Sequence, residues 1–86
     1  MHTIELLEEA VQLATQLGYD VRQEWLGGCG GGACEVAGRR LLFLDSSLGI
    51  SEQLEQIVDA LGVDPALHTV TPGTALAHLL GIRRAA

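Results

Sequence analysis

The sequence predicts a small α+β domain with the element order α-β-β-β-α-α, in which helices pack on one face of a three-stranded antiparallel sheet. Apolar residues recur at helical spacing near both ends of the chain, while β-branched and aromatic residues gather in short segments between them. Glycine and proline separate these segments. The 86 residues allow one domain, so we expect residues 1–86 to form a single folding unit.

The first expected helix runs from Thr3 to Leu17. Its apolar residues are spaced three and four apart, which gives one apolar stripe: Ile4, Leu7, Val11 and Ala14. Three acidic residues favour the positive end of the helix dipole: Glu5, Glu8 and Glu9. Gly18 suits the left-handed position that often follows a helix.

Three strands are expected next, at Tyr19–Leu26, Ala33–Val36 and Arg40–Asp45. Ala37-Gly38-Arg39 between the last two predicts a tight reversal. The last strand holds a continuous apolar run, which predicts that it is covered on both faces or is central in the sheet.

Two helices close the predicted fold. The first extends from Ile50 to Leu61, where Gly62 closes it and Asp64-Pro65 stops the chain from continuing as a helix. The second begins at Thr71-Pro72, with Thr71 expected as its N-cap and Pro72 at the first helical position. Thr74–Leu80 completes this short helix, and Gly81 ends it.

Composition narrows the function classes. The chain has 11 Asp and Glu residues against 5 arginines and no lysine, for a formal net charge of −6, and 48% of its residues are apolar. This balance is typical of a globular protein and gives no positive patch for a nucleic-acid backbone. No apolar run approaches the roughly 20 residues of a membrane span, and the first residues do not resemble a signal peptide. We therefore expect a cytoplasmic protein without nucleic-acid or membrane partners.

The glycine-rich segment, Gly27–Gly32, invites interpretation as a nucleotide-binding site. Gly28–Ala33 satisfies the letters of the dinucleotide fingerprint, which works when it opens a helix whose amides receive a pyrophosphate. Here a strand and a turn follow, and no lysine is available for a phosphate. We favour a wide hairpin connection between the first two strands, or a place where another backbone approaches closely.

A structural zinc site is also disfavoured. Cys29 and Cys34 have a barely permitted separation, and His68 and His78 are too far apart in sequence for the usual pattern. We predict no metal or other cofactor, and no lasting disulfide under cytoplasmic conditions. Cys34 shares a strand face with Val36 and is expected to be a small core residue, whereas Cys29 is expected to be an exposed thiol.

Two more side chains have both a structural and a functional interpretation. Asp45, followed by two serines, is expected to hydrogen-bond its own turn, and no pattern brings it to Asp59 for acid–base work. Trp25 is a candidate interface anchor, because tryptophan is enriched among interface hot spots. A core position against a helix is the commoner outcome for such a residue.

The element order and several short matches resemble the N-terminal half of the ImmA/IrrE-type zinc peptidases. The matches are Gln16–Val21, the glycine-rich turn, Gly38–Asp45 and a helix with Glu52-Gln53. In that family the metal helix reads Ala-His-Glu-Leu-Gly-His, and the collinear segment here is Val58–Val63. The resemblance implies a helix, a three-stranded sheet and a former metal-binding helix.

This resemblance also implies that the peptidase chemistry is lost. A zincin holds zinc with two histidines one helical turn apart and activates water with a glutamate between them. The two ligand positions hold Asp59 and Val63, and the general-base position holds Ala60, within Asp59-Ala60-Leu61-Gly62-Val63. Valine cannot bind a metal and alanine cannot accept a proton, so we expect no catalysis by this mechanism.

Two hypotheses about function follow. The first is a non-catalytic interaction domain that pairs with itself, as a homodimer, or with another protein. Its expected surface lies at the glycine-rich segment: Trp25, Leu26, Gly28, Cys29 and Gly30. The alternative is a small thiol- or metal-dependent protein that uses Cys29, Cys34 and a histidine.

Overall fold

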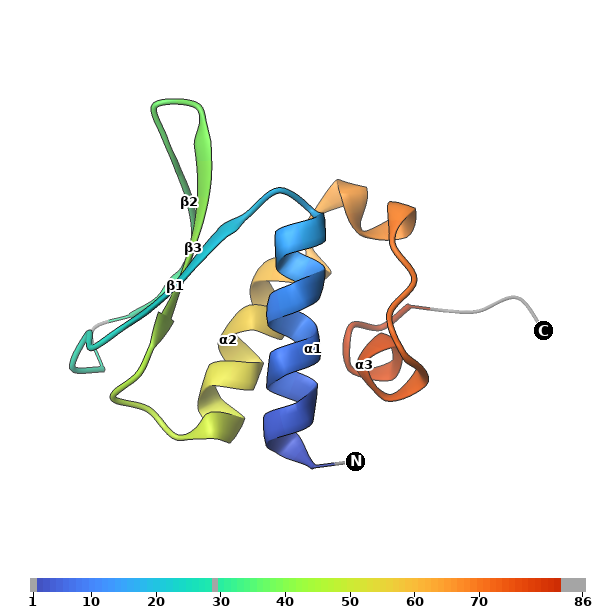
Figure 1. Cartoon of the computed structure of the whole chain (residues 1–86), viewed down its shortest axis with the longest axis horizontal. Helices are drawn as coiled ribbons and strands as arrows, with labels where there is room; N and C mark the ends of the chain where they lie inside the picture. Colours follow the sequence, from blue (N-terminus) through green and yellow to red (C-terminus); the bar gives the residue numbers. More distant parts are fainter. Residues whose placement is uncertain (1, 29, 83–86) are drawn as a thin grey trace.

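The elements follow the predicted order in the computed structural model, which describes residues 2–28 and 30–82 (Figure 1). They are α1 (Thr3–Gln16), β1 (Asp20–Glu24), β2 (Gly32–Val36), β3 (Arg39–Asp45), α2 (Ile50–Gly62), a 3₁₀ helix η1 (Pro65–Thr69) and α3 (Thr74–Leu79). The α+β class and the α-β-β-β-α-α order are therefore confirmed. The short η1 helix was not predicted.

The sheet is mixed, so the prediction of an antiparallel sheet was wrong. Its strand order is β1-β3-β2, and β3 runs parallel to β1 and antiparallel to β2. The reason is the glycine-rich connection, which passes over the end of β3 instead of joining β1 and β2 as neighbours. The predicted reversal between β2 and β3 is confirmed: Ala37 and Gly38 both have positive φ, 52° and 78°, as a two-residue hairpin turn requires.

Two helices cover one face of this sheet. α1 packs against β1, α2 packs against β3 and β2, and the two helices pack against each other (Figure 1). Leu42 and Leu44 of β3 point into this interface and are fully buried, as are Ile57 and Leu61 of α2. β3 is central, as its apolar run predicted. On its other face Phe43 stays partly exposed, because no other described segment covers that face.

α3 and η1 lie on the far side of the helix layer from the sheet (Figure 1). The predicted cap at Thr71 and Pro72 was wrong: α3 begins at Thr74, and Gly73 is its N-cap. The Gly73 amide donates to Glu9 Oε2 of α1 over 2.6 Å, while the Gly73 carbonyl accepts the first helical bond from Ala77. The contact with α1 therefore sets where α3 starts.

The other predicted helix ends are largely confirmed. Gly18 after α1 and Gly81 after α3 have positive φ, 94° and 74°. Gly62 instead lies inside the last turn of α2, with Val63 as C-cap. No helix in the described ranges is long and apolar enough to cross a membrane.

Candidate interaction site at the glycine-rich loop

The carboxylate of Asp45 accepts hydrogen bonds from the backbone of the glycine-rich loop between β1 and β2. Asp45 is the last residue of β3, and its side chain is fully buried. Oδ1 accepts the amide of Leu26 over 3.0 Å, and Oδ2 accepts the amide of Gly28 over 2.7 Å. Oδ1 also accepts the amide and the hydroxyl of Ser47, over 2.9 and 2.6 Å. One carboxylate therefore fixes both the loop before β2 and the turn after β3.

The carboxylate of Asp45 is kept ionised by hydrogen bonds. Burial by itself raises the pKa of this group. The bonds from the Ser47 hydroxyl and from the amides of Leu26, Ser47 and Gly28 outweigh burial and lower the pKa to about 2. All its acceptor positions are used within the fold, so the geometry assigns Asp45 a structural role. The predicted bonds to its own turn are confirmed, and the bonds to the loop are additional.

The loop approaches β3 so closely that only glycine fits at one position. A Cβ on Gly31 would lie 2.7 Å from the backbone oxygen of Phe43, and 3.2 Å from the side-chain amide of Gln56. The Gln56 Oε1 atom in turn accepts the amide of Asp45 over 3.1 Å. Of the two alternatives predicted for this segment, the hairpin was wrong, because β1 and β2 are not neighbours in the sheet. The close backbone approach is confirmed at Gly31.

Four of the five predicted surface residues lie within the described ranges. Trp25 is 76% exposed, the largest apolar side chain on the described surface, so its expected core position was wrong. Leu26 is partly buried, and Gly28 and Gly30 are exposed. Cys29 lies outside the described residues. Trp25 directly follows the end of β1 at Glu24, and the loop that begins there leaves its side chain exposed.

Cys34 was expected in the core and is instead exposed. It pairs with Leu41 on the sheet face that the helices do not cover. A shallow hollow of about 380 Å³ lies there, between the loop and the sheet. Leu26, Cys34 and Phe43 contribute its larger side chains. Strand alternation alone did not show which face would be buried.

The segment collinear with a zincin metal helix borders a second hollow. Asp59 and Ala60 of α2 and the following Val63 line about 410 Å³ of open space with Gln56 and the start of β2. Val63 is 84% exposed. This side of α2 is therefore open to solvent and is not closed by packing against another described segment.

A second polar cluster, not predicted, joins three elements at the opposite end of β3. Tyr19 donates its hydroxyl hydrogen to Asp64 over 2.7 Å. The guanidinium of Arg40 lies over the Tyr19 ring, 4.1 Å from its centroid, and contacts the Tyr19 oxygen, Asp64 and the carbonyl of Leu17. An arginine inside an apolar strand was the sequence signal for it.

Burial and hydrogen bonding shift the pKa values of Tyr19 and Asp64 in this cluster, and the bond to Asp64 raises the pKa of Arg40. Burial and the bond to Asp64 raise the pKa of Tyr19. Burial opposes ionisation of Asp64, but bonds from Tyr19, the Ala66 amide and Arg40 lower the pKa of its carboxyl. Asp64 also caps η1 through Ala66, which explains why Asp64-Pro65 ends the preceding helix as predicted.

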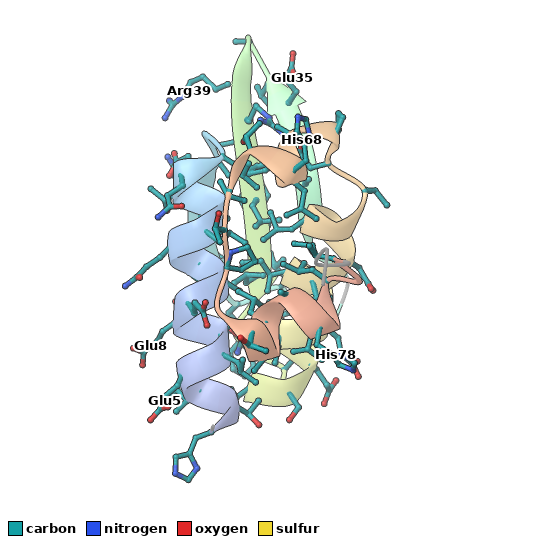
Figure 2. The ribbon with its side chains drawn as sticks, turned by 90° about the vertical axis from the view of Figure 1, so that its right-hand side faces the viewer. Glu5, Glu8, Glu35, Arg39, His68 and His78 are labelled. Atoms are coloured by element: carbon teal, nitrogen blue, oxygen red, sulfur yellow. The ribbon has the colours of Figure 1, made fainter. Side chains whose placement is uncertain are left out.

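The described thiol and histidine residues lie on separate elements: Cys34 in β2, His68 in η1 and His78 in α3. Figure 2 shows His68 in the upper part of the view and His78 well below it. Within the part of the chain that the structure describes, no three His, Cys, Asp or Glu side chains form a group suited to a metal ion.

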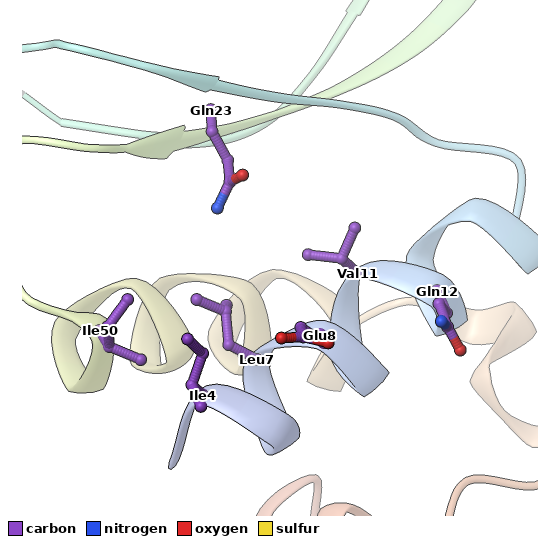
Figure 3. Close-up of a pocket in the computed structure, with 7 residues that line it drawn as sticks. All are labelled: Ile4, Leu7, Glu8, Val11, Gln12, Gln23 and Ile50. Carbon is purple, nitrogen blue, oxygen red and sulfur yellow. The ribbon is translucent and has the colours of Figure 1, made fainter.

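A third hollow, of about 400 Å³, lies between the N-terminal halves of α1 and α2 and strand β1 (Figure 3). Ile4, Leu7, Val11 and Ile50 give it apolar walls, and Gln23 points into it from the sheet. None of the predicted site residues lines it.

No family model, curated protein or solved structure matches this chain.

Proposed function

We propose that this chain is a non-catalytic protein-interaction domain on a degenerate zincin-like scaffold, with Trp25 as its contact residue. The observation that carries the proposal is the combination of a 76% exposed tryptophan with a loop held by a buried carboxylate. A tryptophan on a fixed loop loses little conformational entropy on binding. Hot-spot residues at protein interfaces are often of this type.

The chemistry of the zincin-like segment supports a role without catalysis. Asp59 and Val63 stand where that family carries zinc ligands, and Ala60 stands where it carries a general base. The two aspartates with lowered pKa values, Asp45 and Asp64, have their oxygens occupied by hydrogen bonds within the fold. Neither is available to move a proton of a substrate.

Site-specific photo-crosslinking in cells that produce the full chain tests this function. Trp25→p-benzoylphenylalanine places a reactive aromatic group at the proposed contact. Glu5→p-benzoylphenylalanine is the matched control, because Glu5 is exposed on the first turn of α1 and away from the loop. We expect one defined adduct from position 25 and none from position 5. An adduct of twice the chain mass identifies a second copy, and any other mass identifies a different protein.

Competition shows whether the adduct reflects a specific contact. An excess of the unmodified chain should remove the adduct, and an excess of Trp25→Ser should not. The melting temperature of Trp25→Ser should stay within about 3 °C of the unmodified chain, because an exposed side chain adds little to stability. Equal adduct yields from positions 25 and 5, or equal competition by both chains, would refute the proposal.

A further inference from the structure

We infer that the outer edge of β2 pairs antiparallel with the same edge of a second copy, centred on Cys34, to form a continuous six-stranded sheet. β2 is an edge strand: it pairs with β3 on one side, and no other described strand pairs with its outer side. The inference does not involve Trp25 and goes beyond the contact proposed above.

The strand register shows which backbone groups are free. The amide of Ser46 donates to the carbonyl of Glu24 at the end of β1, so even-numbered residues of β3 face β1. Odd-numbered residues of β3 therefore face β2, where they pair with Gly32, Cys34 and Val36. Because bonding alternates along an antiparallel strand, the amides and carbonyls of Ala33 and Glu35 point to the open edge.

The two edges of the sheet differ in how they are protected. β1 carries charged side chains at alternate positions, and its Asp20 forms ion pairs of 3.1 Å with Arg22 and with Arg39 of β3. β2 has small or apolar residues apart from Glu35, and it lacks the lysine, proline or bulge that usually blocks an edge. Its side chains are exposed from Ala33 to Val36. The β2 edge is thus the one suited to pairing.

The β2 edge is complementary to itself when Cys34 lies at the centre of the pair, which is also the register with the largest strand overlap. With Cys34 at the two-fold axis, Ala33 of each copy lies opposite Glu35 of the other, and these pairs can form four backbone hydrogen bonds. All five residues of each strand then overlap. A register centred on Glu35 would place like charges directly opposite, which is unfavourable. This self-complementarity is the reason to assign the edge to a second copy.

Apolar side chains flank the edge on both faces. Val36 is 55% exposed on the uncovered face, and Val63 is 84% exposed beside the hollow between α2 and β2. A second copy would cover both. We expect a small interface. Because two chains of net charge −6 repel each other, the affinity of the pair should be micromolar or weaker, and it should rise with salt, which screens the charges.

Disulfide trapping tests the register. In Cys29→Ser, Cys34 is the only thiol, and the two Cys34 Cα atoms of a centred pair would lie about 4.5 Å apart, within the range of a disulfide. Diamide takes up the two protons and two electrons released as the bond forms, so this disulfide is a probe of proximity. We expect a covalent dimer that dithiothreitol reverses.

The matched control moves the thiol two residues along the same face. In C29S/C34S/V36C the two thiol-bearing residues of a centred pair would be about 14 Å apart, four strand steps, beyond reach of a disulfide. We expect at least about tenfold less covalent dimer from this variant. Equal trapping from positions 34 and 36 would overturn the inferred register.

Light scattering under reducing conditions tests the non-covalent pair. The unmodified chain should shift from monomer to dimer as its concentration rises to millimolar. Ala33→Pro and Glu35→Pro each remove an outward amide and leave the bonds to β3 in place, so they should stay monomeric. If either proline variant fails to fold, the cysteine pair still decides. A chain that stays monomeric throughout, or an edge occupied by a different protein, would overturn the inference.

The two proposals can fail separately. Trp25→Ser should dimerise and trap through Cys34 as the unmodified chain does. Loss of dimerisation in Ala33→Pro should leave the adduct at position 25 unchanged if that adduct joins a different protein.

Discussion

The two ends of β3 each bury an aspartate, and they stabilise its charge in different ways. At the end of the strand, Asp45 accepts hydrogen bonds from backbone amides and from a serine hydroxyl. At its start, Arg40 of β3 meets Asp64 together with Tyr19. The Asp45 carboxylate is stabilised by neutral dipoles alone, whereas that of Asp64 is stabilised by a cation and a phenol in addition to the Ala66 amide.

This difference has a structural consequence. Backbone donors fix the conformation of the segment that carries them, so Asp45 determines the shape of the loop under Trp25. Side-chain partners instead join segments that are distant in sequence, as Asp64 joins Tyr19 after α1 to Arg40 in β3. We therefore expect changes at Asp45 to affect the loop and the sheet together, and changes around Asp64 to have a smaller, more local effect.

The largest effect is expected for Asp45→Ala. It leaves the amides of Leu26, Gly28 and Ser47 without their acceptor, and we expect the melting temperature to fall by roughly 15 °C. Asp45→Asn keeps one acceptor oxygen and should fall less. Asp59→Ala, on the exposed side of α2, is the control. Circular dichroism melts measure all three, and a change of less than about 4 °C in Asp45→Ala would contradict this role.

The pH dependence of stability gives a second test of the role of Asp45. Because the folded pKa of Asp45 is about 2, below the unfolded value of about 3.9, its contribution is present at pH above about 4 and is lost as pH falls toward 2. The lowered pKa of Asp64 has the same sign. In urea titrations from pH 7 to pH 2, Asp45→Asn should lose less stability than the unmodified chain over this interval.

The next largest effect is expected for Gly31→Ala. Its Cβ would meet the backbone oxygen of Phe43 at 2.7 Å, so the loop must move away from β3, at a cost of about 2 kcal/mol. Gly62→Ala is the control, because Gly62 is helical and nothing lies within 4 Å of the added atom. It should gain about 0.5 kcal/mol. Equal unfolding free energies for the two variants would rule out a close approach at Gly31.

The smallest effect is expected for Tyr19→Phe. It removes the hydrogen bond that Tyr19 donates to Asp64 and the one that it accepts from Arg40. Asp64 keeps Arg40 and the Ala66 amide, so we expect a loss of about 1 kcal/mol. The raised pKa of Tyr19 stabilises the fold below pH about 10, and this contribution is lost as pH rises further. Tyr19→Phe should lack that alkaline loss in unfolding experiments. An unchanged alkaline profile would contradict the burial of this phenol.

Local residue patterns predicted the three α-helices and three strands, and several of the turns that separate them, but not η1. The apolar spacing of α1 and α2, the left-handed glycines at 18 and 81 and the reversal at Ala37-Gly38 depend on neighbouring residues, so local patterns predict them. For the glycine-rich segment the pattern left a hairpin and a close backbone approach both open, and the position of Gly31 against Phe43 decided between them.

Strand order and the contacts between elements depend on residues that are far apart in the sequence, so local patterns did not predict them. Strand order follows from where the loop crosses β3, and this made the sheet mixed. Cys34 is exposed because it lies on the sheet face that the helices do not cover, and Trp25 is exposed on the loop after β1. The partners of Asp45 and Asp64 lie up to 45 residues away along the chain. Spacing rules describe neighbours on one element, whereas burial and hydrogen bonding between elements depend on which faces the whole chain brings together.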